Sequence, residues 1–370
     1  MHAEQTLLQA SGGAQVALDH CTFRLGSVDG VRFWEESGGA ISNCTFEDNA
    51  GYGLWLRGTS PDVDDCVFKN NGNAGRLESG SGKGSFPDFT NTTFEGDDRV
   101  HIASNIDSSG TLTAAPYYID SVRYTLADAT ITIEEGATFT MEDYAGWVVL
   151  GNLIANGSEA APILFTSISG ATEGAQWRSI RLTNADGAGN GLPASRFTHC
   201  ILEGGGYAEQ TLLQASGGAQ VTLDQSIFRF SSVDGVRFFD GSGGAISNCT
   251  FEDVGQYGLR LQSTSPAISG STFQRCGYQA VILQSTQANG SSFPTFSNNT
   301  FGADDYVEIG SHLHSSGQLS NPGQAYIVAG TKYIGTDANV SIAPGTTVKF
   351  TDYSGLIVDG SLNASGSSAE

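Results

Sequence analysis

Arginine and aromatic residues recur at two fixed places in this sequence. Counted from a phenylalanine that ends a short repeat, positions +8 and +10 are apolar, as in Val31 and Phe33 after Phe23. A strand points such residues inward, so positions +9 and +11 face solvent. An aromatic face stacks on a pyranose ring, and a guanidinium group binds a carboxylate or sulfate in a fork. The spacing predicts a sugar-binding strip, which consists of Arg32, Trp34, Trp55, Arg57, Arg237, Phe239 and Arg260. The alternative is a solvated face whose arginines pair with Asp29, Glu35 and Glu36.

The short repeat that positions these residues is a hexad of alternating apolar and polar residues. It occupies residues 18–23, 41–46 and 63–68, with a weaker copy at 89–94, and glycine, asparagine and aspartate fill the gaps. Alternation of this kind is typical of strands, and the gap residues are typical of turns. One such repeat is too short to bury a core alone, but stacked repeats share a continuous one. The sequence therefore predicts an all-β solenoid with turns of about 22 residues.

One turn departs from this spacing. Arg76 and Glu78 occupy the two positions after Phe68 that are apolar elsewhere, and Leu77 lies between them. Burying unpaired charges is costly, so we expect a register shift at 75–84 that keeps both side chains out of the core.

The repeat resembles that of a known family. The pattern apolar-x-Asn-Cys/Ser/Thr-x-Phe, followed by a polar turn and Gly-Leu-Trp-Leu or Gly-Val-Arg-Phe, is similar to the right-handed parallel β-helix repeat of pectate-lyase-like proteins. The resemblance covers nearly the whole chain and implies a right-handed parallel β-helix. That family includes pectate-lyase-like enzymes, polysaccharide epimerases and non-catalytic bacterial surface proteins. The motifs specify the fold and leave the chemistry open.

A large internal duplication organises the chain. Residues 3–16 reappear at 208–221, and the match continues beyond them. We predict one continuous β-helix over 1–370, with copies 3–161 and 208–370 of a roughly 205-residue unit joined by coils 162–207. Met1 and His2 stand where the second copy has Gly206 and Tyr207, so we expect a fragment of a longer secreted protein.

The family resemblance also suggests where catalysis would lie. A lyase of this type needs acidic groups that bind calcium or neutralise a uronate, and a base that abstracts the C5 proton. The weak catalytic candidates are Arg32, Arg57, Arg99 and His101. Calcium is the one candidate cofactor, with possible ligands at Asp62, Asp64, Asp65, Asp97, Asp98, Asp304 and Asp305. In the second copy Tyr306 and Glu308 replace Arg99 and His101, which favours a chain without catalytic residues.

Three of the six cysteines, Cys21, Cys44 and Cys66, occupy the same place in consecutive hexads. We expect a stacked ladder of inward thiols, each acting as a small apolar residue. Disulfides between adjacent turns are an alternative, because stacked strands lie within bridging distance. A zinc site is disfavoured, since the sequence has no Cys-x-x-Cys pair.

The charge of the chain limits its partners. Acidic residues outnumber basic ones by 39 to 17, which gives a formal net charge of −22. Nucleic acid and anionic membranes are therefore poor partners, and no apolar run approaches a membrane span. We predict a non-catalytic scaffold or adhesin segment, extracellular or on a bacterial cell surface, that binds extracellular polysaccharide. The alternatives are a lyase or epimerase acting on an acidic glycan, and a protein that self-associates end to end or laterally into a filament or matrix.

Overall fold

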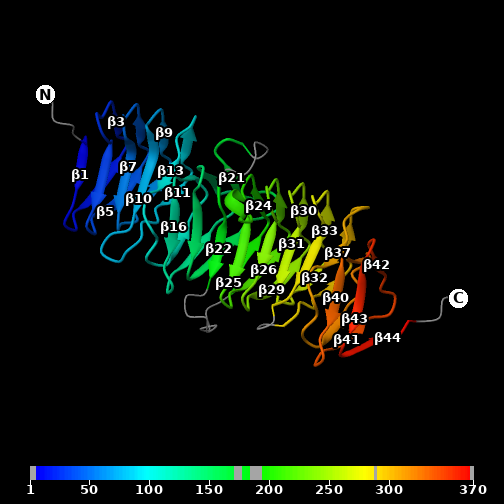
Figure 1. Ribbon diagram of the computed structural model, residues 1–370. Coiled ribbons are helices and arrows are strands. Elements are labelled where there is room, and N and C mark those ends of the chain that lie inside the picture. The colour runs from blue at the N-terminus through cyan, green and yellow to red at the C-terminus, as the bar shows by residue number, and fades with distance from the viewer. Residues whose placement is uncertain (1–5, 171–176, 184–193, 287–289, 367–370) are drawn as a thin grey trace. The chain divides into compact units, whose positions relative to one another are not determined.

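Figure 1 shows the computed structural model, which describes residues 6–170, 177–183, 194–286 and 290–366. The chain divides into two compact units, Met1–Ile168 and Ser169–Glu370, and each is a stack of parallel β-strands. Parts of the predicted copies 3–161 and 208–370 and of the joining coils 162–207 lie outside the described residues. The two-copy organisation stays a prediction.

Unit 1 is built from parallel strands that recur once per coil. The longest row, here called the β4 sheet, consists of β1 (Leu8–Ala10), β4 (Val31–Trp34), β7 (Tyr52–Arg57), β10 (Asn73–Glu78), β13 (Val100–Ile102), β15 (Pro116–Ile119), β18 (Thr138–Met141) and β21 (Ile163–Ser167). Two further rows complete the first coils, namely β2 (Gln15–Asp19), β5 (Gly38–Ser42), β8 (Asp62–Asp64) and β11 (Asp88–Thr90), and β3 (Thr22–Arg24), β6 (Thr45–Glu47), β9 (Val67–Lys69) and β12 (Thr93–Glu95). The later coils add β14 (Gly110–Leu112), β17 (Thr130–Ile133) and β20 (Asn152–Asn156), and β16 (Val122–Thr125) and β19 (Gly146–Val149).

Unit 2 follows the same plan. Its longest row, the β28 sheet, consists of β22 (Ile180–Thr183), β25 (Leu213–Ser216), β28 (Val236–Phe238), β31 (Leu259–Gln262), β34 (Val281–Gln284), β37 (Val307–Ile309), β39 (Tyr326–Val328) and β42 (Val348–Phe350). Two rows beside it are β23 (Ser195–Thr198), β26 (Gln220–Asp224), β29 (Gly243–Ser247), β32 (Ala267–Ser269) and β35 (Thr295–Ser297), and β24 (Cys200–Glu203), β27 (Ile227–Arg229), β30 (Thr250–Glu252), β33 (Thr272–Gln274) and β36 (Thr300–Phe301). The last coils add β38 (Gly317–Leu319), β41 (Asn339–Ile342) and β44 (Ser361–Ala364), and β40 (Thr331–Ile334) and β43 (Gly355–Val358).

Helix is nearly absent from the described part of the chain. The one short helical element there is η1 (Tyr207–Glu209), a 3-10 turn. Among the described residues, no helix has the length and apolar character needed to cross a membrane.

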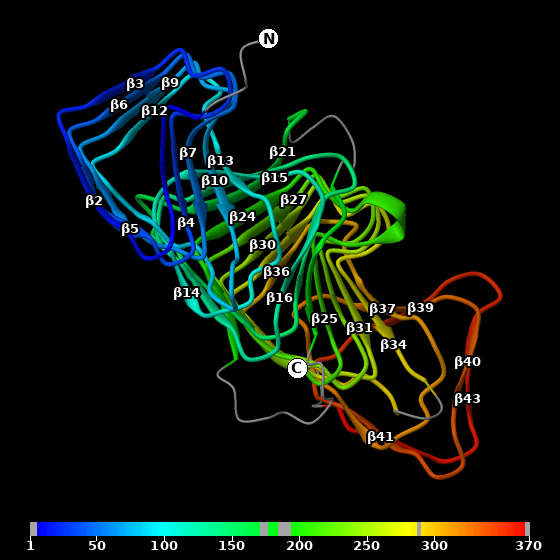
Figure 2. The same ribbon diagram turned by 90° about the vertical axis from the view of Figure 1, so that its left-hand side faces the viewer.

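A column of stacked phenylalanine rings forms the core of the first coils. The ring centroid of Phe46 lies 5.4 Å from that of Phe23 and 4.7 Å from that of Phe68, and Phe68 stacks on Phe94 at 5.4 Å. Strands β3, β6, β9 and β12 pair these residues in register. Figure 2 shows the three walls that surround the column, labelled β2 and β5, β4 and β7, and β3, β6, β9 and β12. The phenylalanines of the hexads thus form the core, but a hexad is not a single strand as its alternation predicted. Residues 41–46, for example, run from the end of β5 through a corner, where Asn43 has φ of 52°, into β6.

The cysteines form the expected ladder of thiols. Cys44 and Cys66 are buried, and no disulfide joins the six cysteines. The backbone N–H of Cys21 donates to Sγ of Cys44, and that of Cys44 donates to Sγ of Cys66, each over 3.4 Å. Burial raises the pKa of the Cys66 thiol to about 11. The thiols therefore fill the role of buried hydrogen-bonding groups as well as apolar ones.

The register shift expected near Arg76 exists, but its predicted position was wrong. The side chain of Asn49 hydrogen-bonds that of Asn71 on the next coil, 22 residues later. Tyr52, however, pairs with Asn73, which is 73 − 52 = 21 residues later. One residue is therefore missing from the turn before β10, ahead of the expected span 75–84. The shorter turn keeps Arg76 at the protein surface, because it moves the charged residues of β10 onto the outer face.

Candidate functional site

A row of polar and aromatic side chains lies on the outer face of the β4 sheet. Strand pairing places Arg32 of β4 beside Trp55 of β7, followed by Arg76 of β10, His101 of β13 and Tyr118 of β15. Their neighbours along each strand point inward, so the alternation of the strands produces the row. The predicted residues Arg32 and Trp55 belong to this row, and we call it the outer row.

Trp55 lies between two guanidinium groups. The Cζ atom of Arg32 is 4.4 Å from the centre of the indole ring, and that of Arg76 is 4.8 Å from it. Because β4 and β10 flank β7, the two groups cover opposite sides of the ring. Both arginines also have carboxylate partners, Asp29 for Arg32 and Glu78 for Arg76. The faces of Trp55 are thus occupied by the protein's own cations, and the charges of these two arginines are compensated.

A hydrogen-bonded relay continues the outer row. Nη1 of Arg76 donates to the hydroxyl of Tyr52 over 2.9 Å, and this hydroxyl lies 3.1 Å from Nδ1 of His101. Nε2 of His101 is 3.1 Å from a carboxylate oxygen of Asp120, which also pairs with Arg123. Burial lowers the pKa of His101, although Asp120 opposes the change. The lowered pKa favours the uncharged imidazole at neutral pH. In the tautomer with its proton on Nε2, on the side of Asp120, Nδ1 accepts from the hydroxyl of Tyr52.

Trp34 and Arg57, which are register neighbours on β4 and β7, line a surface hollow. The remaining lining residues are Glu35, Glu36, Gly58, Gly80 and Ser81. The hollow encloses about 470 Å³, including space open to solvent. The side chain of Arg57 is exposed and forms no ion pair or hydrogen bond with any described residue. Of the strip predicted in unit 1, these two residues are the ones that face open space.

Unit 2 places Arg237 and Arg260 on strands of the β28 sheet and Phe239 directly after β28. Arg237 and Arg260 are register neighbours, and Cζ of Arg237 lies 4.6 Å from the ring centre of Phe239. Nη2 of Arg237 donates to the side chain of Gln262 over 3.0 Å, while Arg260 pairs with Asp234. Burial and the neighbouring charge of Arg260 lower the pKa of Arg237. Three predicted binding residues of unit 2 therefore lie together. Asp234 compensates the charge of Arg260, whereas Arg237 forms no ion pair with any described residue.

A family comparison agrees with this architecture. The family model described as a right-handed β-helix region matches residues 2–112 and 174–324, more than half of the chain. The chain belongs to the right-handed β-helix family. The predicted right-handed parallel fold is thereby confirmed. Searches of curated proteins and of solved structures found no match to the chain.

The four catalytic candidates of this β-helix do not form one cluster. Arg32 and His101 share the outer row but are separated by strands β7 and β10, and Arg57 lines the hollow. Arg99 precedes β13 and pairs with Asp97 over 3.3 Å. His101 alone among the candidates belongs to the relay.

The acidic turns of the β-helix also remain separate. Asp98 is buried and accepts the backbone N–H of Asn71 over 3.3 Å, and Asp305 likewise accepts that of Arg275 over 3.0 Å. Burial raises the pKa of Asp98. Within the described ranges, no three histidine, cysteine, aspartate or glutamate residues gather closely enough to hold a metal ion. Calcium binding stays a prediction. The other acidic candidates are half-buried or exposed, namely Asp62, Asp64, Asp65, Asp97 and Asp304.

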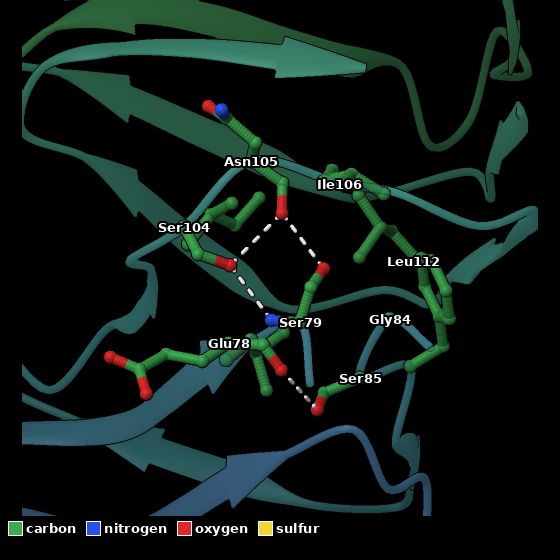
Figure 3. A pocket seen from close by; sticks show the side chains of 11 residues that line it. Glu78, Ser79, Gly84, Ser85, Ser104, Asn105, Ile106 and Leu112 are labelled. Carbon is green, nitrogen blue, oxygen red and sulfur yellow. Dashed lines mark hydrogen bonds between the residues drawn. The ribbon is translucent and has the colours of Figure 1, made fainter. Parts of the chain in front are cut away.

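A second hollow of unit 1, shown in Figure 3, has a structural role. Its serines bond the surrounding backbone: Oγ of Ser104 accepts the N–H of Ser79 over 2.7 Å, and Oγ of Ser85 donates to the carbonyl of Glu78 over 2.8 Å. The carboxylate of Glu78 points away from this hollow in Figure 3, consistent with its contact to Arg76. These serines stabilise the turn between coils.

The sequence predicted Asp29 as a possible arginine partner, and Arg32 does pair with it, but sequence reasoning missed that Asp29 and Asp234 also hold the backbone of the next coil. Asp29 is buried and accepts the backbone N–H of Tyr52 over 2.7 Å, and Asp234 accepts that of Tyr257 over 3.1 Å. A signal existed, because an aspartate precedes the arginine strand at the same place in both copies. A tyrosine opens the following strand in unit 1 and lies two residues before it in unit 2. The sequence indicated His101 as a catalytic candidate, but it did not predict the contact of His101 with Tyr52, which lies 49 residues earlier.

Proposed function

We propose that this β-helix binds polysaccharide on its outer face without turning it over, as an extracellular or cell-surface scaffold or adhesin. The proposal is carried by one arrangement that occurs in both units. In each, an arginine lies against the aromatic residue two positions further along the chain, Arg32 with Trp34 and Arg237 with Phe239. Such aromatic residues beside a hollow offer a surface for the apolar face of a sugar ring.

Binding without turnover is supported by the loss of the relay in the second unit. The strands of the β28 sheet place Ile282 beside Arg260 and Glu308 next in the row. Ile282 thus stands where unit 1 has Arg76, and Glu308 where it has His101. Tyr257 still reaches this point, since its hydroxyl donates to Glu308 over 3.0 Å. The supporting geometry persists while the proton-accepting imidazole is replaced, as expected for a scaffold.

The second candidate is a lyase or epimerase acting on an acidic glycan, and the relay of unit 1 favours it. A neutral His101 can accept the proton of Tyr52, and Arg76 would stabilise the resulting phenolate. A tyrosine oxygen activated in this way could abstract the C5 proton of a uronate. Arg76 is already paired with Glu78, which weakens its hold on a substrate carboxylate.

One experiment separates the two functions. The protein is incubated with neutral and uronic-acid polysaccharides, with and without calcium, while the ultraviolet absorbance of unsaturated product, reducing ends and retention on the polysaccharide are followed. We expect retention without new product or reducing ends. Turnover that disappears in Tyr52→Phe would establish the enzyme instead, and failure to bind any polysaccharide would refute the proposal.

A further inference from the structure

The hollow of unit 1 contains groups of both charges that do not pair with each other. Glu35 and Arg57 are exposed on its rim, and no ion pair joins their side chains. Neither side chain has a partner among the described residues. Lys83 pairs with Glu36 over 2.7 Å, so the charge of that carboxylate is compensated. A free donor and a free acceptor thus face the same space beside Trp34.

Unit 2 has a hollow at the corresponding place. It is lined by Phe239, Asp240, Gln262, Ser263 and Thr286. In both hollows an arginine two residues earlier in the chain lies beside the aromatic residue, and an acid follows the aromatic residue directly.

The turn that holds this acid has the same backbone in both units. Glu35 and Asp240 adopt left-handed conformations, with φ of 53° and 54°. The carbonyl of Glu35 accepts the N–H of Gly13 over 2.9 Å, and that of Asp240 accepts the N–H of Gly218 over 3.0 Å. A left-handed conformation is unfavourable for both residues, so the repeated turn holds the acid at the rim at some cost in stability.

The charges around the hollows do not suit an anionic ligand. Arg32, Arg76 and Arg260 are already paired with carboxylates, and the free charge of Arg57 is balanced by that of Glu35 on the same rim. Arg237 has no ion-pair partner among the described residues and bonds the amide of Gln262. The hollow of unit 2 has an acid, Asp240, and no basic residue in its lining. The net charge of −22 further repels polyanions.

An uncharged sugar matches the same surroundings. Its hydroxyl groups both donate and accept, so vicinal hydroxyls can accept from Arg57 while donating to Glu35. In unit 2, Gln262 and Asp240 offer the same combination. The apolar face of the ring would pack against Trp34 or Phe239.

We propose that each unit carries one subsite for an uncharged glycan, formed around Trp34 in unit 1 and Phe239 in unit 2. This inference rests on the polysaccharide binding proposed above and names its ligand class and its valency. The subsites bind through ring packing and hydroxyl hydrogen bonds, and Trp55 contributes no stacking surface because guanidinium groups cover it.

The test is a titration calorimetry series on the whole chain. The probes are tetrasaccharides of cellulose, xylan, mannan and laminarin, with oligogalacturonate and oligomannuronate as anionic counterparts. We expect at least one neutral probe to bind with two sites per chain, about tenfold more tightly than the anionic probes and with little dependence on salt. Trp34→Ala and Phe239→Ala should each leave one site, and the double variant none.

Matched variants separate lost binding from lost folding. Tyr124→Ala and Tyr278→Ala remove exposed aromatic rings elsewhere on the two units and should keep both sites. Trp34→Phe and Arg57→Gln introduce the residues that unit 2 has at these positions, Phe239 and Gln262. Each variant should still bind the neutral glycan at the unit 1 subsite, with an affinity within about threefold of that of the wild type. Unfolding midpoints measured on every variant show whether the fold is intact.

The outcomes distinguish this inference from the proposed function. Neutral glycan binding that survives both alanine substitutions would overturn the subsites and leave the proposed function standing. A preference for the anionic probes, with affinity that falls steeply with salt and is lost in Arg57→Gln, would overturn the assigned ligand class. Absence of binding to every probe would overturn both proposals.

Discussion

Cys66→Val should destabilise unit 1 even though valine is more apolar than cysteine. The buried Sγ of Cys66 accepts the backbone N–H of Cys44 over 3.4 Å and donates to the carbonyl of Asp64 over 3.2 Å. Valine leaves that N–H buried without a partner, which costs about 1 to 3 kcal/mol. Its additional methyl group returns about 0.8 kcal/mol through burial. We expect the free energy of unfolding to fall by about 0.2 to 2.2 kcal/mol.

Cys66→Ser should cost less, because serine keeps both the donor and the acceptor. Unit 2 contains this arrangement already. Ser271 precedes Phe273 by two residues, as Cys66 precedes Phe68. Its Oγ accepts the N–H of Cys249 over 3.2 Å and donates to the carbonyl of Ser269 over 3.1 Å. A loss below about 1 kcal/mol is expected.

Urea unfolding of the wild type and both variants measures these differences, provided that the denaturant dependence is unchanged. Ser271→Val is the matched substitution in unit 2 and should lose stability as Cys66→Val does, whereas Ser271→Cys should remain close to the wild type. If Cys66→Val is as stable as Cys66→Ser, hydrogen bonding does not explain the thiol ladder and burial alone does.

Three further predictions concern single positions. Because burial lowers the pKa of His101 despite Asp120, the unfolded chain takes up the proton more readily. The stability that His101 contributes is therefore present above about pH 6.5 and is lost below it, by at most about 1.4 kcal/mol per pH unit. The melting temperature of His101→Gln should therefore depend less on pH than that of the wild type. The same pH dependence in both proteins would contradict this. Phe46→Ala should lower the free energy of unfolding by about 3 to 5 kcal/mol, and Phe23→Ala should lower it clearly less. Phe46 is buried between two rings, whereas Phe23 is half-buried with one stacked neighbour. Equal losses in urea unfolding would argue against a stabilising column of rings. Gly241→Ala should lower stability by about 1 kcal/mol, because Gly241 has φ of 73°. A Cβ atom there would meet only the backbone nitrogen of Gly218, at 4.0 Å, so backbone strain is the main effect. Calorimetric melting that matches the wild type would refute the strain argument.

The sequence by itself determined the coil and the direction in which its side chains point. Phe23, Phe46 and Phe68 recur at nearly constant spacing within alternating hexads, and stacked strands turn that spacing into a column of rings. The same alternation predicts that Arg32 and Trp55 face outward, and both lie on the outer face of the β4 sheet. These features depend on period alone, because one residue along a strand always reverses the face.

Only the tertiary structure decided what the outward side chains do. Whether Trp55 is free or enclosed depends on which rotamers Arg32 and Arg76 adopt on the neighbouring coils. The contact of Tyr52 with His101 spans two coils, and the turn before β10, one residue short, sets which side chains of β10 lie between them. Such contacts run across strands that are distant in sequence, so they are governed by turn lengths and side-chain packing that no local pattern encodes.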